Sequence, residues 1–217
     1  MVLTLLPAAA FAKTAENGPE SARIISKPRI GNAKLTDRTM DAESPVRDDV
    51  VLTDLILDQD FETSITDWAF YNVDGNTATY NSNNWSNWRW LAFTDSNGNN
   101  FAHSGDGALY SASWYGSAFD QDNWVCTPEL TIPAAGYCLS YYARSLDESY
   151  PDHLQVLVGE SGVAYDDDGI TTSAWVSLID LYEVAAEYEQ KTIDLSEYAG
   201  KTIELAFRHV DNNQYIL

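Results

Sequence analysis

The 217-residue sequence is poor in cysteine and in basic residues, with two cysteines and with twelve basic residues against thirty-three acids. Cys126 and Cys138 lie twelve positions apart. They are able to pair in an oxidising compartment, but this spacing alone does not establish a disulfide. No apolar run approaches the roughly 20 residues that span a bilayer, so no transmembrane span is expected.

Basic residues are scarce above all after residue 50. Residues 51–217 hold five of them against twenty-six acids, which accounts for the whole formal charge of −21. Because binding to a phosphate backbone needs a basic face, we expect no nucleic-acid partner. A domain this acidic either tolerates its self-repulsion or neutralises part of it with bound cations.

Familiar catalytic motifs are also missing. The three histidines, His103, His153 and His209, do not form HExxH, and the chain has no G-x-S-x-G, P-loop or CxxC. Ser104 follows His103, but neighbours in sequence are not a triad. We expect His209 to pack at a strand end rather than to act as a base. A carboxylate pair for glycoside hydrolysis stays open, since nothing in so acidic a chain singles out one pair.

The N-terminal quarter differs from the rest. Residues 1–12 read MVLTLLPAAAFA and end in a small-x-small sequence, which predicts a signal peptide. The usual basic start is missing, so a buried apolar N-terminus is the alternative. Residues 13–50 contain three prolines, many small polar residues and no sustained apolar period, which predicts a disordered linker or pro-segment.

From Val51 onward, short apolar-alternating stretches are separated by Gly, Asn, Asp and Pro clusters. This period of two is typical of half-buried strands. Strands are expected near 54–61, 67–72, 88–94, 107–115, 122–127, 139–143, 154–158, 174–182, 188–195, 203–207 and 213–217. One helical turn is expected at 195–199, before Gly200. Many short strands joined by polar turns predict an all-β jelly-roll sandwich over residues 51–217.

Oxygen-bearing side chains gather in the expected turns. On a strand, Asp60 and Glu62 would project to one side and Phe61 to the other. Asp74 begins an Asp-Gly-Asn turn, and Asp106 lies in Ser-Gly-Asp-Gly. Further turns of this kind occupy 166–169 and 211–213. Calcium takes six to eight oxygen ligands, so we expect a calcium ion, although Asp-Gly is first of all a turn signal.

Residues 72–100 combine nine asparagines with three of the seven tryptophans. Asparagine favours turns, which predicts a long surface excursion. Trp85 and Trp88 lie in it, and exposed aromatic rings beside amides suit a sugar or a protein partner. Both are therefore candidate ligand-binding residues; the alternative is that they fold back over the sandwich edge. Trp90, Trp114 and Trp124 lie in strand-like runs and are expected in the core.

An ordered series of motifs resembles the cleaved-adhesin, or choice-of-anchor J, domain family, which includes the haemagglutinin/adhesin modules of gingipain-type proteases. The resemblance covers roughly residues 54–217 and depends on the order of many motifs rather than on one. These motifs are Asp60-Phe61-Glu62, Trp68, Asp74-Gly75, Trp90-Leu91, 111–115, 122–125, Thr127-Pro128, 139–143, 152–156, 193–195, 198–201 and 206–209.

The resemblance implies a jelly roll akin to galactose-binding-like and MAM domains, structural calcium, and a role in adhesion on secreted bacterial proteins. Glu62 matches the family's first-strand acid and is the first candidate calcium ligand; Asp60, Asp74 and Asp106 match less closely. The family's last strand usually continues into two aspartates, whereas this sequence ends at Leu217. The resemblance therefore implies a truncated last strand and a missing calcium ligand.

Together these observations predict a non-catalytic, secreted or cell-surface adhesion module within a larger multidomain protein. Its expected partner is a host or matrix protein or a glycan. One alternative is a carbohydrate-binding accessory module of a secreted hydrolase or protease. A second alternative is a concanavalin-like glycosidase, which would place two acids across a cleft.

Overall fold

The computed structural model describes residues 2–7, 56–62, 65–77, 79–80, 83–114, 116–162, 164–166, 169–212 and 214–217. The linker predicted for residues 13–50 lies outside these ranges. Within them the chain forms strands and two short 3-10 turns, η2 (Thr172–Ala174) and η3 (Ser196–Tyr198). The second turn confirms the helical turn expected before Gly200. No helix in the described part is long and apolar enough to cross a membrane.

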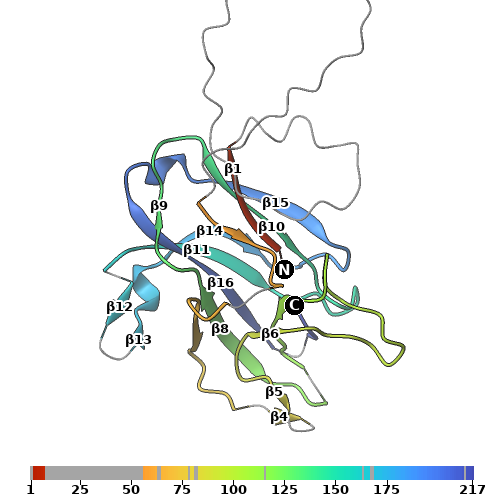
Figure 1. The fold of residues 1–217 in the computed structure, drawn as a ribbon. Coiled ribbons are helices and arrows are strands. Elements are labelled where there is room, and N and C mark those ends of the chain that lie inside the picture. Colours follow the sequence, from red (N-terminus) through yellow and green to blue (C-terminus); the bar gives the residue numbers. More distant parts are fainter. Residues whose placement is uncertain are drawn as a thin grey trace, which may run out of the picture.

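Two antiparallel sheets form the body of the domain (Figure 1). The four-stranded sheet has the order β15 (Glu189–Asp194), β10 (Tyr137–Ala143), β1 (Val2–Pro7) and β2 (Asp58–Gln59). The larger sheet has the order β14 (Val176–Leu181), β11 (Leu154–Glu160), β16 (Thr202–Asn212), β8 (Asp120–Cys126) and β3 (Ala69–Asn72), and β9 (Leu130–Thr131) pairs with β16. The predicted all-β sandwich is therefore confirmed.

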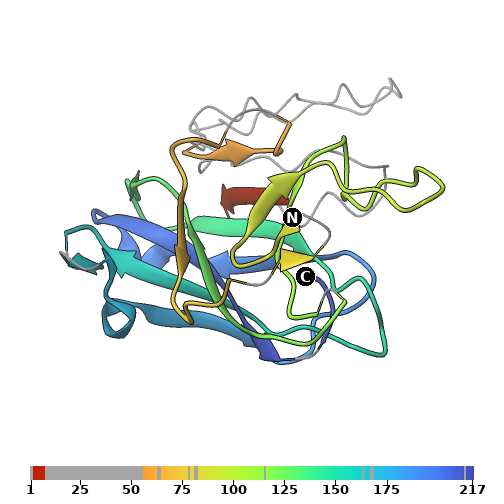
Figure 2. The ribbon, with the colours of Figure 1, turned by 90° about the horizontal axis from the view of Figure 1, so that it is seen from below.

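Three two-stranded ribbons decorate this body. They are β4 (Thr79–Tyr80) with β5 (Asn83–Asn84), β6 (Arg89–Leu91) with β7 (Ala108–Tyr110), and β12 (Tyr165–Asp166) with β13 (Gly169–Ile170). The view from below shows β6 and the loop that follows it on the side of the domain where the two labelled termini lie (Figure 2).

The main core lies between the two sheets and follows the predicted alternation. Leu154, Val156 and Val158 of β11 are buried in it, and each is paired in register with a residue of β16. Val156, for example, lies opposite Phe207, which is also buried. Full burial of such a side chain stabilises the fold by about 1.5–3 kcal/mol, so these strands carry much of the free energy of folding.

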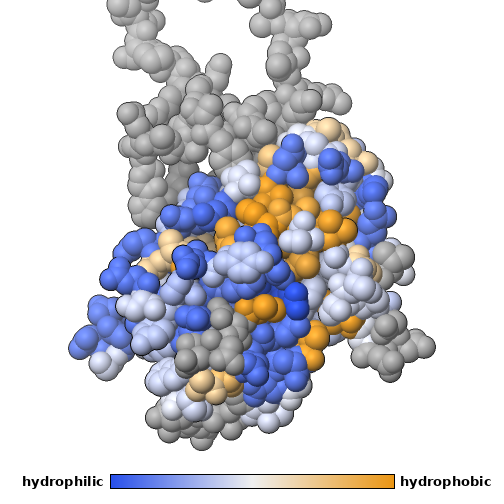
Figure 3. All heavy atoms as spheres, turned by 180° about the vertical axis from the view of Figure 1, so that it is seen from behind, coloured by the Kyte–Doolittle hydropathy of each residue, from blue (hydrophilic) through white to orange (hydrophobic). Residues whose placement is uncertain are grey.

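A second apolar cluster uses the other side chains of the six-stranded sheet. Trp124, Cys126, Leu157 and Ala206 pack there against Trp175 and Ala164. On the back of the molecule, apolar and hydrophilic side chains gather in adjoining areas (Figure 3).

Cys138 is on β10, in the sheet that does not contain Cys126, and both cysteines are buried free thiols. The pairing left open by the sequence is therefore not present.

Residues 2–7 occupy an interior position of the four-stranded sheet. Strand β1 pairs with β10 on one side, with Leu3 opposite Tyr141, and with β2 on the other, with Leu3 opposite Gln59. This arrangement gives the segment a hydrogen-bonded strand on each side. Cleavage after residue 12, as a signal peptide would require, stays a prediction.

The C-terminal residues pack against the segment that follows β7. Leu217 exchanges two backbone hydrogen bonds with Ser111, at 3.1 and 2.8 Å, and Ile216 forms a β-bridge with Ala112. Ile216 is fully buried in a third cluster with Trp85 and Tyr110. The strand expected at 213–217 is wrong for the described residues 214–217, which form only this isolated bridge, because β16 already extends to Asn212.

Candidate functional site

The candidate metal ligands Asp60 and Glu62 lie in a turn after β2 whose backbone has an unusual conformation. Strand β2 ends at Gln59, and Phe61 has a φ of 63°, in a region that bulky residues rarely adopt. Gln59 Oε1 accepts the Phe61 N–H at 2.7 Å, and Asp60 Oδ1 accepts the Glu62 N–H at 2.9 Å. The expectation that Asp60 and Glu62 line one side of a strand is wrong, because a turn replaces the strand at Phe61.

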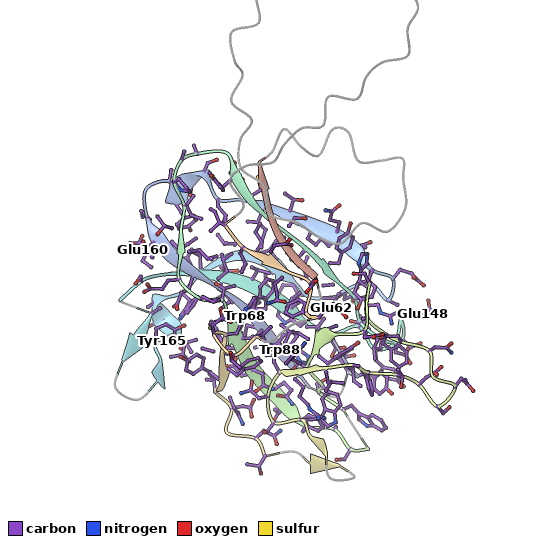
Figure 4. The ribbon with its side chains drawn as sticks, in the orientation of Figure 1. Glu62, Trp68, Trp88, Glu148, Glu160 and Tyr165 are labelled. Atoms are coloured by element: carbon purple, nitrogen blue, oxygen red, sulfur yellow. The ribbon has the colours of Figure 1, made fainter. Side chains whose placement is uncertain are left out.

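Glu62 joins this turn to a distant loop. Its Oε1 atom accepts the backbone N–H groups of Asp106 at 2.9 Å and of Gly107 at 2.8 Å. Figure 4 labels Glu62 among the side chains of the domain. Gly105 has a φ of 61°, and a Cβ atom there would lie 2.3 Å from Glu62 Oε1. A Cβ atom there would displace the Glu62 carboxylate, and the positive φ in itself favours glycine at this position.

Trp90 completes this part of the surface. Its Nε1–H donates to the Phe61 carbonyl at 2.7 Å, while 40 % of the residue is exposed. A Cβ atom at Gly107 would lie 2.1 Å from the same carbonyl oxygen, so Gly107 is needed for this contact too. We call the group formed by Asp60, Glu62, Trp90 and residues 105–107 the Glu62 corner. It combines carboxylates with an anchored, partly open indole ring.

The four candidate calcium ligands divide between two places. Asp60, Glu62 and Asp106 belong to the Glu62 corner, where the Asn100 amide also donates to the Gly105 carbonyl at 3.0 Å. Asp74 instead contacts β8, since its Oδ2 accepts the Asp122 N–H at 2.6 Å. Its other oxygen caps its own turn by accepting the Asn76 N–H. The structure therefore assigns Asp74 to the support of a turn.

The donors of the Glu62 corner suit calcium in kind, since they are carboxylate and carbonyl oxygens. One observation limits the fit: within the described ranges, no three His, Cys, Asp or Glu residues are grouped closely enough to hold a metal ion. The corner supplies three carboxylates, those of Asp60, Glu62 and Asp106, but they are too far apart to form a ready-made ligand cluster. Backbone carbonyls and water would have to complete the shell of a bound ion.

The two tryptophans expected to face a ligand are buried. Trp85 is 1 % exposed and Trp88 is 5 % exposed. Trp88 Nε1–H donates to the Asn123 carbonyl at 3.0 Å, and its ring meets His209 edge to face. The expectation of exposed rings is wrong, and both fold back into the domain, because the excursion carrying them packs on the sandwich.

Two tryptophans expected in the core are exposed instead. Trp90 and Trp114 are 40 % and 37 % exposed, whereas Trp124 is buried as expected. Trp90 is on a strand of only three residues, so alternation there does not fix which side is covered. Trp114 packs against Tyr215, at 5.8 Å between ring centroids. Sequence reasoning therefore missed Trp90 as the open ring of the site.

A serine, a histidine and an aspartate also meet, but in the interior. Ser111 Oγ lies 2.7 Å from His209 Nδ1, and Asp152 Oδ1 lies 3.1 Å from His209 Nε2. All three residues are fully buried, so no substrate reaches them. Their hydrogen bonds connect β16 to residues 111 and 152, and this confirms the expectation that His209 packs in the fold. Nothing in the sequence spacing signals these partners.

Comparison with known proteins agrees with this architecture. Hemagglutinin A of Porphyromonas gingivalis (strain ATCC BAA-308 / W83) is 30 % identical over 172 residues, an alignment that covers 71 % of this chain and 7 % of that protein. The chain thus corresponds to a small part of its relative. A second Porphyromonas gingivalis Hemagglutinin A sequence is 29 % identical over 175 residues, covering 72 % of this chain and 6 % of that protein.

Solved structures share the fold. The K3 cleaved adhesin domain of Lys-gingipain from Porphyromonas gingivalis W83 superposes with a TM-score of 0.53 at 25 % identity, covering 74 % of this chain and 91 % of that domain. The K2 cleaved adhesin domain of Lys-gingipain gives 0.53 at 20 % identity, covering 72 % and 91 %. The family model described as Cleaved Adhesin Domain matches residues 61–217, which is well over half of the sequence. The chain therefore belongs to the cleaved adhesin domain family.

Proposed function

We propose that this chain is a ligand-binding adhesion module of a larger secreted or cell-surface protein, stabilised by calcium at the Glu62 corner. The cleaved adhesin domain is a non-catalytic module, and its relatives are domains of large multidomain proteins. The buried Ser111, His209 and Asp152 group agrees with this, because it holds the fold together and offers no access to a substrate.

The calcium proposal rests on the way in which Glu62 is held. Its Oε1 atom takes two peptide N–H groups, and in the described part of the chain no hydrogen bond engages Oε2. Asp60 and Asp106 add carboxylate oxygens from the adjoining turn and loop. The excess of twenty-one negative charges gives a further reason for a bound cation, since an ion removes repulsion from the folded state.

Calorimetric titration tests calcium binding. Purified protein freed of metal by EDTA and dialysis is titrated with calcium chloride, beside Glu62→Gln and the control Glu197→Gln, whose residue is exposed on η3. We expect saturable binding by the wild type and the control, and at least tenfold weaker binding by Glu62→Gln, because the amide keeps the shape and loses the charge. Unchanged affinity of Glu62→Gln would place the ion elsewhere.

The ligand is proposed to be a glycan or a protein on a host cell or matrix surface. The name of the relative, Hemagglutinin A, points to red cells as a practical probe. Trp90 offers the open ring beside the corner, and such rings stack well on sugars or apolar side chains. The exposed Trp90 ring also fits the alternative of a carbohydrate-binding accessory module, in which it would contact a polysaccharide.

Binding of the fluorescently labelled protein to erythrocytes, and to a glycan array, tests the adhesion role. Trp90→Ala is compared with Trp114→Ala, which removes a tryptophan of similar exposure in a different contact. We expect binding that Trp90→Ala weakens and Trp114→Ala leaves unchanged, with the melting temperature of each variant as the control for folding. Binding lost equally in both variants would contradict the assignment of Trp90.

A further inference from the structure

Among the residues that the structure describes, Arg144 is a cation without a carboxylate partner, in a strongly acidic domain. It is one of only five basic residues after residue 50, where twenty-six acids are present. Asp122 pairs with Arg208, Glu189 with Lys191 and Glu160 with Lys201, but no ion pair involves Arg144 among the described residues. A charged group that is partly buried in a protein needs a compensating charge or hydrogen bonds, so the missing partner of Arg144 calls for an explanation.

Aromatic rings and one carbonyl surround the guanidinium instead. Its Cζ atom lies 4.9 Å from the centre of the Tyr188 ring and 5.6 Å from that of Phe101. One nitrogen, Nη2, donates to the Phe101 carbonyl at 3.2 Å. The Nε atom is buried and has no hydrogen-bond partner within the described chain. The side chain is thus fixed in place with one strong donor unused.

A small cavity lies beside the Arg144 side chain. It is lined by Arg144, Tyr110, Leu109, Leu146, Leu154 and Trp88, among others, and has a volume of about 10 Å³. A volume of this order accommodates one particle about the size of a water molecule. Tyr110 is 2 % exposed, and its hydroxyl is a second buried group without a partner in the described chain. Arg144 is close enough to oppose the rise in the Tyr110 pKa that burial causes.

We infer that this cavity binds a small monatomic anion, chloride in ordinary buffers, between the Arg144 guanidinium and the Tyr110 hydroxyl. Both groups donate hydrogen bonds and neither carries a negative charge, which suits an anion and gives no role to a metal cation. Apolar walls and a small volume exclude larger, polyatomic anions. The site is separate from the Glu62 corner and does not depend on the proposed calcium.

Water is the competing occupant, and charge favours the anion. A water molecule accepts hydrogen bonds from both donors but leaves the guanidinium charge uncompensated. A halide ion accepts both hydrogen bonds and also compensates the charge. The ion would also link elements that are distant in sequence, since Tyr110 is on β7, Arg144 follows β10, and Leu217 of the C-terminal segment lines the same cavity. We therefore expect the anion to stabilise the packing of the excursion and the C-terminal residues on the sandwich.

Melting temperature in different sodium salts tests the site. Chloride and bromide are compared with gluconate, which is too large for the cavity, at a fixed calcium concentration and a constant ionic strength of about 0.5 M. High ionic strength screens the acidic surface, which otherwise opposes the approach of an anion. With the halide tenfold above its dissociation constant, we expect the wild type to melt about 3–6 °C higher than in gluconate.

The chain supplies a matched pair of variants. Tyr110→Phe removes one hydroxyl from the cavity. Tyr141→Phe removes the hydroxyl of another fully buried tyrosine that has no partner in the described chain and does not line the cavity. We expect Tyr110→Phe to lose most of the halide shift and Tyr141→Phe to keep it. Equal melting temperatures of the wild type in chloride and gluconate, or an unchanged halide shift in Tyr110→Phe, would overturn the inference.

A crystal grown in sodium bromide gives a direct view. We expect an anomalous bromide peak between Arg144 Nε and Tyr110 Oη. Density for a water molecule at that position, without an anomalous signal, would show that the cavity is a hydration site and would overturn the inference as well.

Discussion

Trp88 provides a quantitative test of the packing, because the sequence and the structure give it opposite roles. If its ring faced a ligand, replacement by alanine would leave stability nearly unchanged, as exposed substitutions usually do within about 0.5 kcal/mol. The structure instead leaves only 5 % of Trp88 exposed and gives its indole N–H a carbonyl partner. The substitution Trp88→Ala therefore opens a cavity and leaves the Asn123 carbonyl without this donor.

The expected cost follows from these two losses. Removal of a buried tryptophan side chain costs about 3–5 kcal/mol. Small domains have a free energy of unfolding of about 5–15 kcal/mol, so the variant would lose a large part of its stability. For a domain of this size each kcal/mol lowers the melting temperature by about 2–4 °C, which predicts a fall of about 6–20 °C.

Thermal unfolding followed by far-ultraviolet circular dichroism measures the effect without relying on tryptophan fluorescence. Trp114→Ala is the control, since that ring is 37 % exposed, and we expect its melting temperature to fall much less. A change below about 3 °C in Trp88→Ala, or an equal fall in both variants, would refute the assignment of Trp88 to the interior.

Two further predictions concern a loop and a histidine. Gly105→Ala, at a φ of 61° and with a Cβ 2.3 Å from Glu62 Oε1, should lower the melting temperature and weaken calcium binding. Gly162→Ala, also at positive φ but in open space, should lower the melting temperature without changing calcium binding. Equal calcium affinities of the two variants would contradict the contact between residue 105 and Glu62. Burial lowers the pKa of His103 below its usual 6.5, so the unfolded chain takes up the proton more readily and stability should fall as the pH drops below about 6.5. The melting temperature of His103→Gln should change less between pH 7 and pH 5 than that of the wild type, and identical pH profiles would show that His103 does not contribute.

Much of the fold could be predicted because strand alternation is a local property. Leu154, Val156 and Val158 needed only their own spacing to indicate a buried side, and the structure confirms it. The family resemblance rested on motif order, and the family match confirms that too. By contrast, β1 between β10 and β2 depends on pairing between residues more than fifty positions apart, which spacing does not reveal.

The site was less predictable, because tertiary contacts decide it. Glu62 was a candidate from the sequence, but its partners at 106 and 107 are 44 and 45 residues away. The turn at Phe61 contradicts the local strand pattern and depends on side chains of Gln59 and Asp60. The tryptophans were assigned by whether a strand or a loop carried them, whereas their burial is set by how the excursion packs on the sandwich.

The central claim, that calcium held at the Glu62 corner stabilises this adhesin domain, is tested most directly by paired thermal melts. The wild type and Glu62→Gln are melted in excess calcium and in EDTA. At 100-fold excess over the dissociation constant, binding to the folded state alone adds about 2.7 kcal/mol, which corresponds to a rise of about 5–11 °C. The account predicts this rise in the wild type and its loss in Glu62→Gln. Equal melting temperatures of the wild type in calcium and in EDTA would contradict it.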